Sequence, residues 1–257
     1  MARTLTGNNA QREQRLQSLM LDRIVAKYER RIQKEIVRAM HSAAYKYREG
    51  NTLAVDLMLP EHQEKLTKLL NSLWLETGGQ FSEHIVRGLK SYKPSEIKQD
   101  EIPPTEAANA IMMNWIRSYG ASKITQITST TQNDITSIIT TGIADGLSER
   151  EIARQISTLS STLAGSRAQT IARTETHGAA NVAAQATAEA TGIDMQRQWV
   201  AAGGERTRTT HQEANGQIVG MREPFTVGGV SLMFPGDPSA NAPAETINCR
   251  CAVIFVV

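Results

Sequence analysis

Cysteines and long apolar runs are scarce in this sequence of 257 residues, and each of these two scarcities excludes a class of protein. Aromatic residues are also few, at 5%. Two cysteines cannot build the disulfide framework of a small secreted domain. No apolar run approaches the about 18 residues of a membrane-spanning helix, so we expect no membrane among the partners. The first residues hold no apolar signal-peptide core, and we therefore expect a protein that is made in a reducing cytoplasm.

An excess of one charge sign is also missing from the total, but not from its distribution. The 28 basic and 26 acidic side chains leave a net charge of +2. Residues 1–100 carry 17 basic and 12 acidic side chains, whereas residues 101–257 carry 11 and 14. With 40% hydrophobic residues the chain can bury a core, and its basic first part favours an acidic partner.

Residues 10–48 are predicted to form one long basic helix. Apolar side chains recur every four residues from Leu16 to Ala44, which makes a stripe that drifts around the axis rather than a heptad seam. The basic side chains between the stripe residues are Arg23, Lys27, Arg30, Arg31, Lys34 and Arg38.

This basic face has two interpretations. No acidic residue of the helix stands four positions before a basic one, so the best intrahelical ion pairs are missing. We therefore predict docking on DNA phosphate or on an acidic protein surface, with a merely solvated face as the alternative. No pattern of aromatic residues between the basic ones suggests base readout, so any DNA contact should be independent of sequence.

A domain boundary is predicted in the middle of the chain. A second helix is expected from Pro60 to the pair Gly78-Gly79, followed by a short helix over residues 81–89. Residues 91–104 contain three prolines and are the best linker candidate. We therefore assign residues 1–103 to a basic, helical docking region and residues 104–257 to a second domain.

The second domain is predicted to begin with helices over residues 105–191. Capping-box patterns at Ser148 and Ser166 indicate two separate helices there, and the second one is rich in alanine. Residues 195–257 contain short β-like runs separated by Gly, Pro and Asn turns, which indicate a small, loop-rich antiparallel sheet. The expected fold class is α+β, with a long-helix N-terminal region, a helical segment and this C-terminal sheet.

The C-terminal motif Cys249-Arg250-Cys251 is a weak zinc signal. On a strand, side chains two positions apart face the same side, so both thiolates could meet one zinc ion together with His211. His177 or Glu213 could complete four ligands. Because C-x-C lacks the spacing of strong zinc motifs, we favour buried thiols without a cofactor and keep zinc as the alternative.

Enzymatic interpretations are weaker still. His211 and Asn215 match a His-x3-Asn nuclease pattern, but only Glu213 and Asp237 stand near as further metal ligands. A thiol hydrolase would pair Cys249 or Cys251 with a histidine, and nothing local marks an activated thiol. We expect no catalytic residue and no enzyme, with nuclease and thiol hydrolase as alternatives.

Two arginines precede His211 in an extended segment. Arg206 and Arg208 alternate, so both face one side and could hold phosphate or carboxylate in a bidentate manner. The interpretation that we favour is structural: ion pairs with Glu205, Glu213 or Asp237 that hold a loop-rich sheet together.

The order and spacing of these C-terminal motifs resemble the phage head morphogenesis family, the Mu F-like minor head proteins of tailed bacteriophages. The resemblance covers roughly residues 105–257. Its motif residues, for which we expect structural roles, are Arg173, Glu175, Asn181, Trp199, Arg206, Arg208, His211, Gly216, Asp237, Cys249 and Cys251. Many members carry Asp where this chain has Gly204, and others carry an additional Cys pair within residues 206–211, so a four-cysteine metal site does not transfer.

This resemblance implies a minor capsid protein with no established catalytic activity. Such a protein is assembled in the host cytoplasm and resides in the virion, in the capsid interior or at the portal vertex. The implied partners are the phage portal protein during prohead assembly, the scaffold or major capsid protein, and packaged double-stranded DNA. A DNA-binding protein that is ejected with the genome is the alternative.

Overall fold

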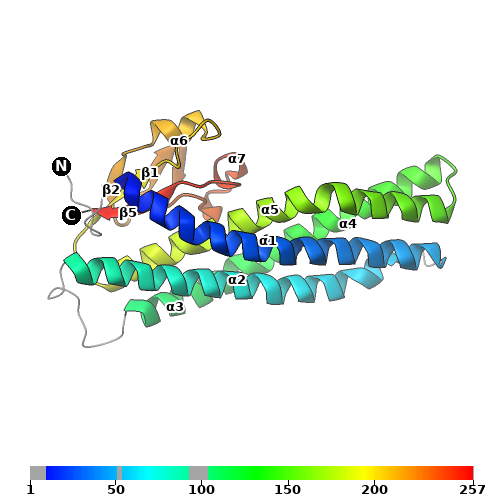
Figure 1. The fold of residues 1–257 in the computed structure, drawn as a ribbon, viewed down its shortest axis with the longest axis horizontal. Helices are drawn as coiled ribbons and strands as arrows, with labels where there is room; N and C mark the ends of the chain where they lie inside the picture. Colours follow the sequence, from blue (N-terminus) through cyan, green and yellow to red (C-terminus); the bar gives the residue numbers. More distant parts are fainter. Residues whose placement is uncertain (1–9, 51–53, 93–103, 257) are drawn as a thin grey trace. The chain divides into compact units, whose positions relative to one another are not determined.

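The computed structural model describes residues 10–50, 54–92 and 104–256 (Figure 1). Most of the linker predicted at residues 91–104 falls on residues 93–103, outside the described residues, so the boundary at 103/104 stays a prediction. None of the helices in the three described ranges combines the length and apolar character that a membrane span requires.

Helices make up nearly all of the described residues up to Ala190. They are α1 (Ala10–Arg48), α2 (Ala54–Tyr92), α3 (Pro104–Trp115), the π-helical turn η1 (Ile116–Gly120), α4 (Ala121–Ala144) and α5 (Glu149–Ala190). The capping box at Ser148 is confirmed, because its Oγ accepts from the N–H of Glu151 at 3.3 Å while its own N–H donates to the Glu151 carboxylate at 2.9 Å.

Two predicted helix breaks were wrong. Helix α2 starts at Ala54 and continues through Gly78-Gly79, where Gly78 lets Met112 approach so closely that a Cβ would lie 3.1 Å from its Cε. Helix α5 continues through Ser166, whose hydroxyl donates to the carbonyl of Leu163 within the same helix instead of capping a new one. At Gly78 the packing of Met112 overrides the local stop signal, and at Ser166 a hydrogen bond within the helix does so.

The C-terminal part holds two small antiparallel sheets, so the predicted α+β class is confirmed. Strands β1 (Gln196–Val200), β2 (Ile218–Gly220) and β5 (Ala252–Val256) form one sheet in the order β2-β1-β5. Strands β3 (Phe225–Val227) and β4 (Val230–Leu232) form a hairpin. Three short helical segments lie between the strands: α6 (Thr209–Glu213), η2 (Pro238–Ala240) and α7 (Pro243–Thr246).

The elements group into two compact units, each described by itself. The bundle unit comprises residues 26–72 and 116–172, from α1, α2, α4 and α5. Its core contains the predicted α1 stripe from Tyr28 to Ala44, buried together with apolar residues of the other helices such as Leu66, Leu70, Ile135 and Ile156. The stripe residue Leu16, which belongs to the other unit, is 40% exposed.

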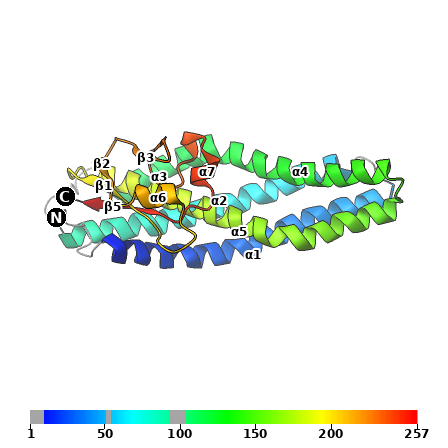
Figure 2. The same ribbon diagram turned by 90° about the horizontal axis from the view of Figure 1, so that it is seen from above.

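The mixed unit comprises residues 1–25, 73–115 and 173–257. Both views place the first turns of α1 beside the sheet of β1 and β5 (Figures 1 and 2), and Gln14 donates to the carbonyl of Arg250 at 3.4 Å. Trp74 packs edge-on against Trp115 in its helical part, while Trp199 and Phe225 are buried at the sheets. This unit positions nearly all of the C-terminal motif residues.

Candidate functional site

His211 and the two cysteines converge because two irregular segments of the mixed unit meet. His211 is buried on the short helix α6. Cys249 and Cys251 precede β5, and the chain turns into them at Asn248, whose φ of 58° lies in the left-handed region that Asn tolerates better than most residues. The predicted convergence therefore does not come from strand alternation, but from this turn.

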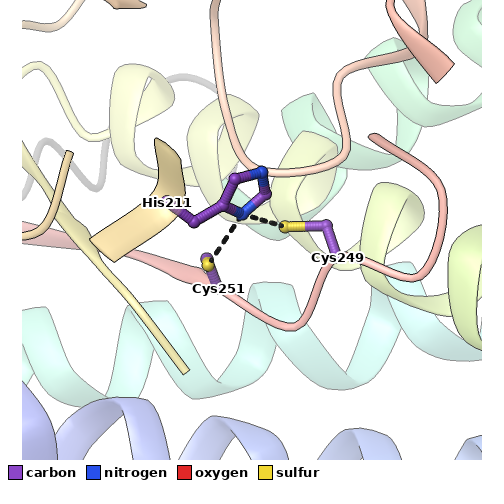
Figure 3. Close-up of side chains that lie close together, drawn as sticks. All are labelled: His211, Cys249 and Cys251. Carbon is purple, nitrogen blue, oxygen red and sulfur yellow. Dashed lines mark hydrogen bonds between the residues drawn. The ribbon is translucent and has the colours of Figure 1, made fainter. Parts of the chain in front are cut away.

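The three side chains form a compact cluster (Figure 3). His211 Nδ1 lies 3.3 Å from Cys251 Sγ and 3.6 Å from Cys249 Sγ. All three residues are at most 3% exposed, and their ligand atoms lie within 4.8 Å of one another. Neither His177 nor Glu213 joins them, and within the described residues this is the one group of three or more metal-competent side chains.

A carboxylate fixes the other side of the imidazole. Glu245 of α7 lies with its Oε2 2.9 Å from His211 Nε2 and also accepts from the hydroxyl of Thr210 at 2.9 Å. On the opposite flank, the ring of Trp199 meets the imidazole edge-on, with 5.5 Å between the ring centroids. The orientation of His211 is therefore held by a polar and an aromatic neighbour together.

The two thiols differ in their electrostatics. A hydrogen bond from Cys249 lowers the pKa of the Cys251 thiol to about 5, and His211 and the N–H of Ala202 act in the same direction. The same hydrogen bond, together with burial, raises the pKa of Cys249 well above its ordinary value. The hydrogen bond therefore favours the thiolate at Cys251 and the protonated thiol at Cys249.

A cleft of about 560 Å³ opens onto this cluster. Four arginines line it, together with Glu205 and the three clustered side chains; the arginines are Arg173, Arg206, Arg208 and Arg250. The cleft is therefore a basic surface with a sulfur- and nitrogen-rich floor.

The ion pairs expected for Arg206 and Arg208 are not found among the described residues. Arg208 instead donates to the carbonyl of Ile247 at 2.6 Å. Asp237 accepts from the N–H groups of Met233 and Ser239, both at 2.9 Å, and so stabilises its own turn.

Three of the other motif residues connect α5 to neighbouring segments. Asn181 donates to the carbonyl of Pro235 at 2.9 Å, and Arg173 donates to the side chain of Asn248 at 3.2 Å. Glu175 is buried and accepts from the indole N–H of Trp74 at 3.2 Å. These contacts fit the structural roles that the sequence suggests for them.

The turn motif Asn215-Gly216 connects α6 to β2. Gly216 has a φ of 85°, which an L side chain adopts only with strain, and its N–H donates to the carbonyl of Trp199 at 2.8 Å. The side chain of Asn215 accepts from the N–H of Ala201 at 2.9 Å. This engagement, and the exposure of Glu213, leave the nuclease pattern without an assembled metal site among the described residues.

Arg197 is a central residue that the sequence analysis missed. It stands in β1 with no exposed surface, and its guanidinium donates to the carbonyls of Gly220, Glu223 and Met233 and to the side chain of Gln185 at 2.9 Å. Its plane also lies over the ring of Phe225, 5.2 Å from the centroid. A basic residue within an otherwise strand-like run was the available signal.

The basic residues predicted for docking lie on α1, Arg23 in the mixed unit and the other five in the bundle unit. Arg23, Arg30, Arg31 and Lys34 are exposed, as is Arg38, while Lys27 is half-buried. Arg38 pairs with Glu35 at 3.2 Å, three positions earlier, and Arg31 lies over the ring of Tyr28.

Comparison with known proteins shows what the part of the chain that carries these motifs is similar to. Residues 133–254 match the family described as Phage Mu protein F like protein. A segment of 67 residues, 25% of this chain, is 39% identical to the minor head protein GP7 of Bacillus phage SPP1. A segment of 66 residues, 26% of this chain, is 39% identical to the NAD(+)–arginine ADP-ribosyltransferase EFV of Enterococcus faecalis.

These matches cover 21% of the minor head protein and 13% of the ADP-ribosyltransferase, so the similarity spans only a small part of either relative. No solved structure matches the chain. The resemblance carried by the C-terminal motifs is confirmed, because residues 133–254, which contain them, match the Phage Mu protein F like family.

Proposed function

We propose that this protein is a minor capsid protein of a tailed bacteriophage that acts in head morphogenesis and resides in the virion at the portal vertex. The observation that carries the proposal is the family match over residues 133–254, which includes the buried cluster and the arginine-lined cleft. The partial match to a phage minor head protein supports the same role.

The surface that we assign to docking is the basic face of α1 in the bundle unit. At about 100° per residue, the five basic positions from Lys27 to Arg38 fall within an arc of about 100°. Four of these five side chains are exposed, and Arg38 forms an ion pair with Glu35. A one-sided band of positive charge is suited to an acidic portal surface or to DNA phosphates.

Portal docking is tested by co-expression of the full-length chain with the portal protein of the same phage, followed by co-purification. The variant Arg30→Glu/Lys34→Glu reverses two exposed charges of α1, whereas Arg150→Glu/Arg154→Glu reverses two exposed charges of the same bundle unit near the start of α5. We expect the α1 variant to retain about tenfold less portal protein, and the matched control to behave as wild type.

The two possible failures are distinguishable. Equal retention by both variants would contradict the assignment of the α1 face as the docking surface. A wild-type chain that retains no portal protein, and that is missing from purified virions by mass spectrometry, would contradict the proposed function itself.

DNA binding is the second candidate, favoured by the same basic face. Phosphate contacts give an affinity that falls steeply with salt and is independent of sequence, with about 0.9 units of logarithmic slope for each phosphate neutralised. We expect the Arg30→Glu/Lys34→Glu variant to lower the salt slope by about 2. If the wild-type chain does not bind double-stranded DNA at low salt, this candidate function is wrong. The hypothesis that the protein is ejected with the genome as a DNA-binding protein is then wrong as well.

We propose a structural rather than an enzymatic role. The name of the ADP-ribosyltransferase relative describes that protein, and the shared segment is 13% of its length. Purified wild type, His211→Ala and Cys251→Ser should all show background activity with DNA and a divalent metal, and activity in wild type alone would contradict this proposal.

A further inference from the structure

We propose that His211, Cys249 and Cys251 form a zinc site, with Nδ1 of the imidazole and the two Sγ atoms as ligands. A zinc ion there would cross-link α6 to the segment before β5 and so stabilise the loop-rich C-terminal part of the mixed unit. This inference concerns the fold of that unit and holds whether or not the protein docks on a portal.

The distances fit one ion without rearrangement of the backbone. A zinc ion about 2.0 Å from nitrogen and about 2.3 Å from sulfur places tetrahedral ligand atoms about 3.5–3.8 Å apart. His211 Nδ1 lies 3.3 and 3.6 Å from the two sulfurs, and the three ligand atoms lie within 4.8 Å of one another. Shifts of a few tenths of an ångström to about 1 Å, which side-chain rotation supplies, complete the geometry.

The surroundings of His211 are those of a metal-binding imidazole. A ligating histidine usually donates its second ring N–H to a carboxylate, which fixes the tautomer and turns the other nitrogen toward the metal. Here Nε2 lies 2.9 Å from Glu245, and Glu245 is itself held by the hydroxyl of Thr210 at 2.9 Å. The lone pair of Nδ1 then points between the two sulfurs (Figure 3).

Buried thiols without a metal explain less of this arrangement. A pair of cysteines that only fills space in a core needs no imidazole between its sulfurs and no carboxylate behind that imidazole. Two thiols and an imidazole are also the ligand types that select zinc over hard cations such as magnesium or calcium.

The site would connect segments that few strands hold together. Its ligands stand 38 and 40 residues apart, on α6 and on the segment before β5. The chain between them contains only strands of three residues and helices of three or four residues. Closing a loop of that length removes conformational entropy from the unfolded chain, which gives the ion a structural role.

The fourth coordination position would face the arginine-lined cleft. Since three side chains of this chain supply ligands, a water molecule from the cleft would complete the tetrahedron.

The proposal is tested on the full-length chain, purified without chelators from cells grown with added zinc. Elemental analysis should give one zinc per chain, and X-ray absorption at the zinc edge should give two sulfurs at about 2.3 Å and one imidazole nitrogen at about 2.0 Å. Replacement by cobalt should give the thiolate charge-transfer absorption and the visible bands of a tetrahedral site.

Variants identify the ligands. Cys249→Ser, Cys251→Ser and His211→Ala should each lower the zinc content at least tenfold, while Thr246→Val, which removes a neighbouring buried hydroxyl, should leave it unchanged. Glu245→Gln should keep the stoichiometry but weaken zinc affinity about 10- to 100-fold.

Two results would overturn the proposal. One is a wild-type chain that carries less than a tenth of an equivalent of zinc and gives no cobalt spectrum. The other is a zinc-edge spectrum without sulfur neighbours, which decides the matter on the native chain even where a ligand variant fails to fold.

Discussion

Arg197 connects the two C-terminal sheets, and we expect it to make a large contribution to the free energy of unfolding. Its guanidinium donates to three backbone carbonyls, at the end of β2, after the following turn and after β4, and to Gln185 of α5. Arg197→Met keeps an unbranched apolar side chain at this position and removes every one of these donors, together with the guanidinium that lies over the ring of Phe225.

The magnitude follows from the acceptors left behind. Four oxygen atoms lose a donor, and each such loss costs about 1 kcal/mol where water can return and up to about 3 kcal/mol where it cannot. Residues Gly220, Glu223 and Met233 are not fully buried, so their carbonyls can be rehydrated in part. Removing a buried charge offsets some of the loss, and we expect a net destabilisation of about 3 kcal/mol.

The assay is urea denaturation of the full-length chain followed by circular dichroism, with thermal unfolding as a second measurement. A loss of about 3 kcal/mol corresponds to a fall in Tm of roughly 6–12 °C for a chain of this size. Arg197→Lys keeps the charge but not the planar fork, so it should be destabilised by about half as much. If Arg197→Met loses less than about 1 kcal/mol, the guanidinium is not what holds these segments together.

Three further changes test other parts of the fold. Ser148→Ala removes the capping box with Glu151 and should cost about 1 kcal/mol in the free energy of unfolding, whereas an unchanged value would show that the box is not formed in solution. Gly142→Ala would bring a Cβ within 2.5 Å of Ile152, so the overpacking cost of about 1–3 kcal/mol should exceed the helix-propensity gain of about 1 kcal/mol and lower the free energy of unfolding. In a chain that already carries Ile152→Ala, the same substitution should raise the free energy of unfolding instead. Burial lowers the pKa of His177 to about 3, so the unfolded chain takes up this proton first. This contribution to the free energy of unfolding is fully present above about pH 6.5 and is lost as the pH falls toward 3. Urea denaturation at several pH values should therefore show that wild type loses about 4 kcal/mol more than His177→Leu over this range. Parallel pH profiles of the two proteins would contradict the prediction.

Local rules sufficed where the signal was local. The four-residue spacing of apolar side chains in α1 depends only on helix periodicity, and the stripe from Tyr28 to Ala44 is buried as predicted. The capping box at Ser148 depends on two residues three positions apart. The turn at Asn215-Gly216 depends on the one residue type that tolerates a φ of 85° without strain.

Local rules failed where a distant residue decides. Gly78 predicts a break, but Met112 fills the space that its missing side chain leaves, and α2 continues. Ser166 failed for a different, local reason: its hydroxyl donates to the carbonyl of Leu163, three positions earlier within α5, instead of capping a new helix. The four acceptors of Arg197 lie 12 to 36 residues away, so no window of the sequence contains both the donor and its partners.

The motif residues of the Mu F-like region are of two kinds: some form hydrogen bonds with backbone groups, and others contact one another through their side chains. Asn181, Asp237 and Gly216 satisfy backbone groups, and the fold fully explains their chemistry. The side chains of His211, Cys249 and Cys251 contact one another, and the carboxylate of Glu245 adds a polar partner for the imidazole that a plain core would not need. A residue set whose geometry exceeds what packing requires points to a ligand, and this is the physical reason to look for a metal at His211 rather than at the other motif positions.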